Sequence, residues 1–159
     1  MLNDDYKDML RALSEEGASF LLVGAYALAV HGYPRATMDI DLWVMPSPAN
    51  SSAVMRALRR FGAPLQDLTE DDLHADGIVF QIGVAPRRID LLTSLSGLNY
   101  QDAYERSLPM KVDGLEFRVL SVRDLIRNKR ATGRTKDLAD IEVLEQCYGV
   151  DQADSSSKR

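Results

Sequence analysis

The sequence predicts an α+β domain in which helices flank a mixed or antiparallel β-sheet and a helical pair lies towards the C-terminus. Three observations support this fold class. A strand, a short helix and a second strand follow one another within residues 20–44. Two later stretches have the pattern of antiparallel hairpins, and amphipathic helices are expected on both sides of these segments.

Length and composition set the scale of the domain. With 159 residues, of which 45% are apolar, the chain is long enough for one core and too short for two, so we expect a single domain over residues 1–150. Residues 151–159 are polar, include a serine run and are expected to form a disordered tail. No apolar run approaches the length of a membrane span, and we expect a soluble, cytoplasmic protein without a membrane partner.

Charge, cysteine and histidine content disfavour several classes of site. The net charge is −5, whereas proteins that bind long nucleic acids mainly through phosphates are usually basic, so such a substrate would need a local basic patch. The single cysteine, Cys147, excludes an intramolecular disulfide and a cysteine-based zinc site, and we expect it to be buried in a C-terminal helix. His31 and His74 lack the spacing of metal ligands, which disfavours a zinc hydrolase.

Helices are expected where apolar residues recur at helical spacing between capping and breaking residues. These segments are residues 4–16, 26–30, 48–61, 100–107, 122–131 and 135–147. Ser121 is a favourable N-cap, and Asp124 at the third helical position is expected to serve the free N–H groups of that first turn. The acidic stretch 62–76 is expected to be a short helix or a loop.

Strands are expected in short apolar or alternating runs. These are residues 20–23, 38–44, 77–84 and 88–92, and both halves of residues 111–119. The turn Asp113-Gly114 is a strong hairpin signal. The runs 77–84 and 88–92 are separated by three residues, which predicts a second antiparallel hairpin.

Two aspartates alternate with apolar residues in the strand 38–44. Side chains at positions i and i+2 of a strand leave the same face, so Asp39 and Asp41 project together while Ile40 and Leu42 enter the core. Two neighbouring carboxylates repel each other unless a cation lies between them, and Mg²⁺ commonly binds one or two carboxylates together with substrate phosphates. The alternative interpretation is an edge strand whose polar face meets water.

A third carboxylate, Asp90, lies between Ile89 and Leu91 in the strand 88–92. It should face the polar side of the sheet or have a partner, because burying a lone charge is costly. If Asp90 lies beside Asp39 and Asp41, three carboxylates converge on one metal site. The alternative is an ion pair between Asp90 and Arg87 or Arg88.

The order of strand, Gly24-Ala25 turn, short helix and Asp39-x-Asp41 resembles the signature of the DNA polymerase beta-like nucleotidyltransferase superfamily, whose core is a palm-like sheet. The resemblance implies that backbone N–H groups of the turn approach nucleotide phosphates, and that Asp39, Asp41 and Asp90 are catalytic and bind Mg²⁺ or Mn²⁺. The turn departs from the usual Gly-Gly or Gly-Ser of the family, because Ala25 supplies neither a hydroxyl nor a second glycine.

A second motif lies near the C-terminus. Asn128-Lys129 followed by the segment 133–140, GRTKDLAD, is similar to small bacterial nucleotidyltransferases that include the AbiEii/AbiGii abortive-infection toxins. This resemblance implies that Lys129 and Arg134 contact phosphates and that Asp137 orients them or assists proton transfer. Arg35, near the Asp-x-Asp strand, adds to a local basic rim. For Lys136, an intrahelical ion pair with Asp140 is the favoured alternative.

Together these resemblances imply a reaction in which a nucleoside monophosphate is transferred from an NTP to an acceptor hydroxyl. The acceptor would be tRNA or another RNA, a protein or a small molecule. A toxin would also have a cognate antitoxin as partner. One competing hypothesis is a nucleotide-binding or protein-interaction module that has kept the scaffold without turnover, which the Gly24-Ala25 departure favours. The other is a plain structural domain whose acidic groups are surface charges.

Overall fold

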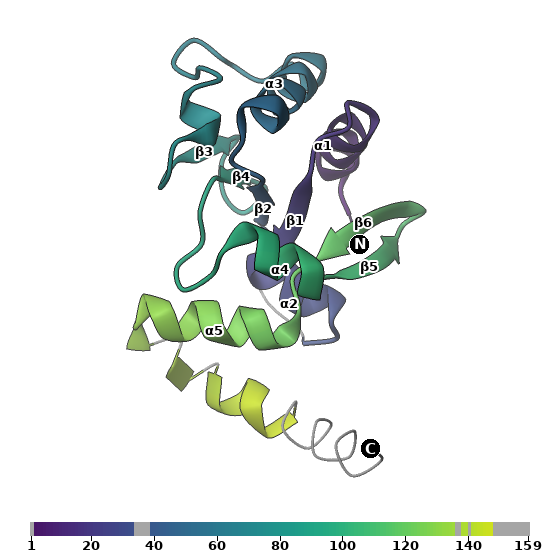
Figure 1. Ribbon diagram of the computed structural model, residues 1–159. Helices are drawn as coiled ribbons and strands as arrows, with labels where there is room; N and C mark the ends of the chain where they lie inside the picture. The colour runs from purple at the N-terminus through teal and green to yellow at the C-terminus, as the bar shows by residue number, and fades with distance from the viewer. Residues whose placement is uncertain (1, 34–38, 136–137, 140, 148–159) are drawn as a thin grey trace.

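The computed structural model describes residues 2–33, 39–135, 138–139 and 141–147. It confirms the α+β fold class, with one six-stranded mixed sheet in the order β3-β4-β2-β1-β6-β5 (Figure 1). The strands are β1 (Phe20–Val23), β2 (Ile40–Val44), β3 (Val79–Ile82), β4 (Ile89–Leu92), β5 (Leu108–Val112) and β6 (Leu115–Val119).

Both predicted hairpins are present at the edges of the sheet. The pairs β3–β4 and β5–β6 are antiparallel, and Asp113 adopts the positive φ of 51° that its turn requires. At the centre, β1 and β2 are antiparallel, whereas β1 pairs with β6 and β2 pairs with β4 in parallel. The sheet is therefore mixed, and the strand that follows Asp39 lies directly beside the strand that contains Asp90.

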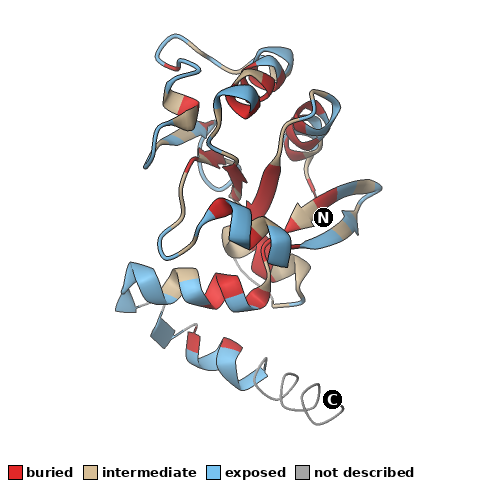
Figure 2. Ribbon diagram, in the orientation of Figure 1, coloured by how far each residue is buried: buried red, intermediate tan, exposed pale blue. Residues whose placement is uncertain are grey.

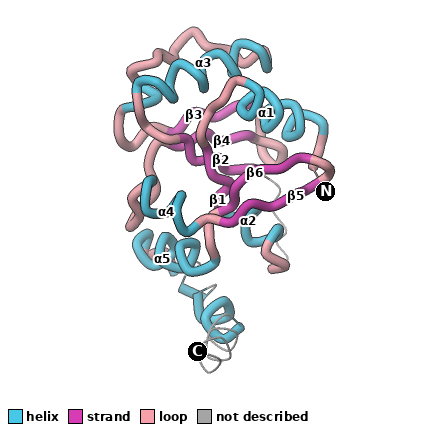
Figure 3. Tube along the Cα trace, turned by 45° about the vertical axis from the view of Figure 1, so that its right-hand side comes forward, coloured by secondary structure: helices cyan, strands magenta, loops and turns pink. Residues whose placement is uncertain are grey.

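Helices cover both faces of the sheet (Figures 1 and 3). One face carries α1 (Asp4–Glu15) and α3 (Pro48–Phe61), which pack against each other. The other face carries α2 (Gly24–Val30), α4 (Tyr100–Arg106) and α5 (Val122–Thr132). In the part of the chain that the structure describes, no helix is both long and apolar enough to cross a membrane.

The core lies between these two helical layers (Figure 2). β1 is buried throughout its length, and β2 is buried except at Asp41. Ile40, Leu42 and Leu22 are fully buried, as the alternation in the strand predicts. On the opposite side of β2, Trp43 is 1% exposed and packs edge-on against Tyr100, with ring centroids 5.1 Å apart. Trp43 therefore belongs to the core beneath α4.

Local sequence signals explain most helix ends. Ser47 accepts a hydrogen bond from the Asn50 N–H, Pro48 occupies the first turn, and Gly62 ends α3 in the left-handed conformation. The helix predicted at residues 26–30 begins two residues earlier, at Gly24. The acidic stretch 62–76 contains only a 3₁₀ turn, Asp72–His74.

Asp124 has a different role from the one predicted. Ser121 caps α5 by accepting the Asp124 N–H, as expected, but the Asp124 carboxylate binds Arg106 Nε at 2.9 Å and lies 3.7 Å from Arg127 Nη1. Its side chain is fully buried. The carboxylate thus joins α5 to α4 because a buried charge is offset better by guanidinium groups than by N–H groups alone.

The second member of the predicted C-terminal helical pair is helical at residues 135, 138–139 and 141–147. Ile141 and Leu144 are buried, but Cys147 is exposed, so the prediction of a buried cysteine is wrong. At 100° per residue, Cys147 is rotated about 120° away from Ile141, which takes it off the buried face. Lys136, Asp137, Asp140 and the predicted tail 151–159 lie outside the described residues.

Candidate active site

The structure brings Asp41 and Asp90 together at the centre of the sheet. The register of β2 and β4 places Asp41 directly opposite Asp90, and facing residues of adjacent strands lie about 5 Å apart with side chains on the same face. The juxtaposition expected from the sequence is therefore present.

Asp39 lies immediately before β2, at the same end of the site. The strand predicted over residues 38–44 starts at Ile40 in the structure, and residue 38 lies outside the described residues. The Asp39 Oδ1 atom accepts the backbone N–H of Arg88 at 3.0 Å. This bond fixes Asp39 to the beginning of β4, two residues before Asp90.

Gly24 has a steric role beside Asp41. Its φ of +72° favours glycine, and a Cβ atom at this position would lie 2.3 Å from Asp41 Oδ2. The missing side chain therefore leaves room for the Asp41 carboxylate against the start of α2. The neighbouring Ala25 is half-buried in the first turn of the same helix.

The environment of Asp41 disfavours its ionised form. Burial, followed by the charge of Asp90, the hydrogen bond to Asp90 and the charge of Asp39, raises the pKa of Asp41 to about 7. Arg88 acts in the opposite direction but does not outweigh these effects. Burial first, and the two neighbouring carboxylates second, thus favour the protonated form of Asp41.

Arg88 is the positive partner that the site contains. Its Nε and Nη2 atoms lie 2.7 Å and 3.1 Å from the two oxygens of Asp90, a two-pronged contact, and Nη2 lies 3.7 Å from Asp39 Oδ2. The ion pair considered as an alternative for Asp90 exists, alongside the convergence of the carboxylates. The sequence signal for it is the spacing of Arg88 and Asp90, which places both side chains on one face of β4.

Tyr6 is a neighbour of the site that the sequence pattern assigned only to helix packing. Its hydroxyl group donates a hydrogen bond to the Arg88 carbonyl at 3.4 Å, and its ring meets Tyr26 of α2 edge-on. Burial and the charge of Asp39 raise the pKa of Tyr6 to about 12, so this phenol stays protonated at neutral pH. Tyr6 thereby links α1 to the backbone that positions Arg88.

The predicted phosphate-binding residues lie in α5 and directly after it, and α5 covers the same face of the sheet as α4 (Figure 1). Lys129 is half-buried in its last turn, and Arg134 is exposed just after Gly133 ends the helix. Asn128 Nδ2 donates to the Ser96 carbonyl at 3.0 Å, which ties α5 to the loop after β4. The remaining predicted binding residues, Arg35 and Asp137, lie outside the described residues.

His31 supports the fold next to the site. It ends α2, and its Nε2 atom lies 2.8 Å from the Leu120 carbonyl oxygen. Leu120 in turn donates its N–H to Leu22 of β1 at 3.0 Å. This contact anchors the end of α2 to the connection between β6 and α5.

A hard divalent cation suits the carboxylate cluster in chemistry. Asp39, Asp41 and Asp90 offer only carboxylate oxygens, which Mg²⁺ prefers, and the pKa of Asp41 is raised by burial first and then by the neighbouring carboxylates. However, no three Asp, Glu, His or Cys side chains among the described residues form a ready set of metal ligands. The carboxylate oxygens are suitable ligands for Mg²⁺, and the backbone places the three aspartates near one another. The side chains of Asp39 and Asp90, however, are turned towards Arg88.

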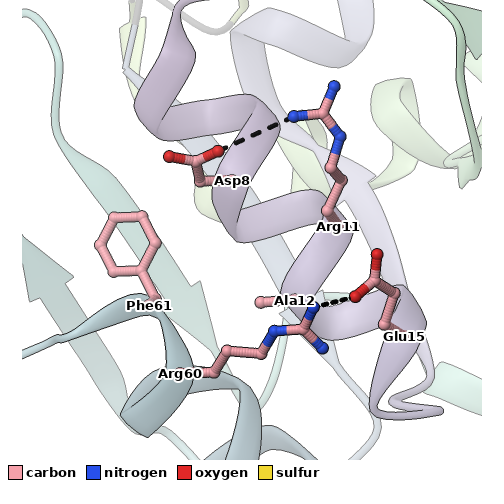
Figure 4. A pocket seen from close by; sticks show the side chains of 6 residues that line it. All are labelled: Asp8, Arg11, Ala12, Glu15, Arg60 and Phe61. Carbon is pink, nitrogen blue, oxygen red and sulfur yellow. Dashed lines mark hydrogen bonds and ion pairs between the residues drawn. The ribbon is translucent and has the colours of Figure 1, made fainter.

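A small hollow on the other face of the sheet has a different character (Figure 4). Its volume is about 210 Å³, and it lies between α1 and α3. Its charges are already matched, because Arg11 lies 3.8 Å from Asp8 and Arg60 pairs with Glu15. The lining residues are Asp8, Arg11, Ala12, Glu15, Arg60 and Phe61. We interpret it as a packing gap between two helices.

Comparison with known proteins identifies the family of this chain. Residues 2–152 match the model of a family described as nucleotidyltransferases of unknown function (DUF6036). The chain belongs to this nucleotidyltransferase family. Membership supports nucleotidyl transfer in general terms, and the narrower resemblance to AbiEii-like toxins stays a prediction. Among curated proteins, none is significantly similar to the chain in sequence.

A solved structure supports the fold of this DUF6036 member. It is that of a Thermotoga maritima protein described as a putative nucleotidyltransferase (TM1012), with a TM-score of 0.59. The alignment covers 94% of this chain and 96% of the other, at 13% sequence identity. At that identity the likeness establishes the nucleotidyltransferase-like fold alone.

Proposed function

We propose that the chain transfers a nucleoside monophosphate from an NTP to an acceptor hydroxyl, with Mg²⁺ or Mn²⁺ bound by Asp39, Asp41 and Asp90. One observation carries the proposal. Asp41 and Asp90 face each other on neighbouring strands, beside Asp39 and the Gly24 turn, in a member of a nucleotidyltransferase family.

Each of the three aspartates has a defined role in this proposal. Asp39, Asp41 and Asp90 would hold the cation, and Asp90 would also take up the proton of the acceptor hydroxyl. When bound, the cation polarises the reacting oxygens and offsets the charge of the leaving pyrophosphate. Burial of Asp41 strengthens its attraction to a cation, because charges interact more strongly away from water.

The phosphate chain of the NTP would be held by basic groups and by the glycine turn. Lys129 and Arg134 would donate charge-assisted hydrogen bonds to it, supported by the α5 contact with the loop after β4. Gly24 and Ala25 would present backbone N–H groups. Arg35 and Asp137 complete this set from the sequence resemblance.

We propose three candidate classes of acceptor, which experiments can distinguish: tRNA or other RNA, protein, and small molecules. A net charge of −5 disfavours extended RNA contacts and favours a compact acceptor or a local contact. The motif that starts at Lys129 motivates a role as the toxin of a toxin–antitoxin or abortive-infection system, with a cognate antitoxin as partner.

A second candidate function is a nucleotide-binding or protein-interaction module without turnover. Two observations favour it: Ala25 in the turn, and the occupation of both Asp90 oxygens by Arg88. Such a module would bind NTP or a partner protein but form no product.

The first experiment measures the thermal melting shift caused by each NTP with and without Mg²⁺. A ligand at 100 times its Kd stabilises by about 2.7 kcal/mol, which for a domain of this size corresponds to about 5–10 °C. The Asp39→Ala/Asp41→Ala variant should lose the Mg²⁺-dependent shift. The matched control, Asp67→Ala/Asp76→Ala, removes two exposed carboxylates and should keep it.

The same proteins are then incubated with α-labelled NTP and each acceptor class. Labelled acceptor together with released pyrophosphate is the expected result for the wild type and the control. Binding without labelling would favour the module without turnover. If no NTP shifts the wild type at millimolar concentration, the nucleotidyltransferase proposal fails for this chain.

A further inference from the structure

The contacts of Arg88 set it apart from an ordinary surface arginine. Its guanidinium group contacts both oxygens of Asp90, whose side chain is 10% exposed, and its own backbone N–H binds Asp39. Two-pronged pairs between arginine and a carboxylate are among the stronger ion pairs in proteins. One residue therefore engages two of the three site carboxylates through different atoms.

We propose that Arg88 is a positioning residue that competes with the divalent cation for Asp39 and Asp90 and holds these carboxylates in place until a cation replaces its guanidinium group. The inference rests on the proposed function, because it requires the three carboxylates to bind the cation. It also accounts for two features together: Asp41 and Asp90 face each other beside Asp39 without forming a ready set of metal ligands among the described residues, and Asp39 and Asp90 are turned towards an arginine.

Competition follows from geometry and charge. A cation such as Mg²⁺ needs carboxylate oxygens at about 2.0–2.1 Å, but both Asp90 oxygens already face Arg88 nitrogens at 2.7 Å and 3.1 Å. A guanidinium group and a divalent cation on the same oxygens would also repel each other. In this proposal, binding of the cation therefore weakens the contact between the guanidinium group and Asp90 and favours its departure.

The surroundings allow the side chain to move while the backbone stays. The Arg88 carbonyl accepts hydrogen bonds from the Ile40 N–H at 3.0 Å and from the Tyr6 hydroxyl at 3.4 Å, which fix the main chain. The Arg88 side chain itself is 30% exposed and has a path to solvent. Once released, its N–H donors lie at the border of the site and are available to a phosphate oxygen.

The test measures binding of Mn²⁺ alone, by electron paramagnetic resonance and calorimetry, to the wild type and to Arg88→Gln. Removing the competing charge should tighten Mn²⁺ binding by about tenfold or more, and it should lower the melting temperature in EDTA. The decrease in melting temperature caused by Arg88→Gln should be smaller at saturating Mn²⁺ than in EDTA. The matched control, Arg59→Gln, removes an exposed arginine from α3 on the opposite face and should bind Mn²⁺ like the wild type.

A second variant, Arg88→Lys, keeps the charge but cannot form the two-pronged contact, and its Mn²⁺ affinity should fall between those of wild type and Arg88→Gln. If Arg88→Gln does not fold, Arg88→Lys is the variant that tests the inference. Mn²⁺ affinity equal to or below that of the wild type in folded Arg88 variants would overturn this inference alone. Failure of wild type and variants alike to bind Mn²⁺ would overturn it together with the proposed metal site.

Discussion

Asp41→Asn should stabilise the protein in the absence of divalent cations while abolishing nucleotidyl transfer. The asparagine keeps the shape of the side chain and has an amide group that can donate to Asp90, but it never ionises. Because burial and the neighbouring carboxylates raise the pKa of Asp41 to about 7, its ionisation opposes folding. The substitution removes that cost.

The magnitude follows from the difference in pKa between the two states. In the unfolded chain an aspartate has a pKa of about 3.9, and each pKa unit corresponds to about 1.4 kcal/mol. The stabilisation that comes from protonated Asp41 is complete below about pH 4 and is lost as the pH rises through about 7. The full loss approaches about 4 kcal/mol, of which about 2–3 kcal/mol develops between pH 5 and pH 8.

Thermal melting in EDTA at pH 5 and at pH 8 measures this effect. The melting temperature of Asp41→Asn minus that of the wild type should increase by about 5–10 °C between pH 5 and pH 8. Asp76→Asn, which changes an exposed carboxylate, is the control and should show no such growth. An advantage that stays constant with pH, or reverses, would refute the electrostatic argument for Asp41.

Two further predictions concern packing near the site. Gly97→Ala should lower the melting temperature and weaken NTP binding, because its Cβ would lie 2.7 Å from Ala131 Cβ and push α5 outward. Gly77→Ala has a similar positive φ but no atom within 4 Å, so it is the matched control for backbone strain; an equal loss in both variants would contradict the steric explanation. Asp124→Asn should destabilise by about 2–3 kcal/mol in urea unfolding, because it leaves Arg106 without its buried partner. Exposed Asp102→Asn should change stability little, and a similar loss in both would contradict the assignment.

The placement of the carboxylates followed from the sequence because it depends on local rules. Strand parity put Asp39 and Asp41 on one side, and the spacing of the two apolar runs predicted the hairpin that contains Asp90. The neighbouring position of that hairpin came from the family resemblance, and the register between Asp41 and Asp90 confirms it. Roles in catalysis stay predictions for all three residues.

The remaining features of the site depend on contacts between distant segments. Tyr6 and Arg88 are 82 positions apart, and no local pattern indicates that a tyrosine of the first helix reaches the start of β4. Whether Asp90 contacts a cation or Arg88 depends on side-chain rotamers, which the spacing of residues in the sequence does not determine. The contact of Gly24 with Asp41 likewise requires the three-dimensional approach of α2 and β2.

Asp41 and Asp124 show why the same substitution should have opposite signs in one domain. Asp124 is a single buried carboxylate facing two guanidinium groups, at 2.9 Å and 3.7 Å, so its charge is needed to offset theirs. Asp41 is largely buried beside Asp90 and Asp39, and these effects on its pKa outweigh that of Arg88. Neutralising Asp124 therefore deprives two partly exposed guanidinium groups of the buried carboxylate that they contact. Neutralising Asp41 instead removes a largely buried charge and its repulsion by two other carboxylates. A cation that binds to these carboxylates would offset the negative charge that destabilises the cation-free protein. Its binding would therefore stabilise the folded state.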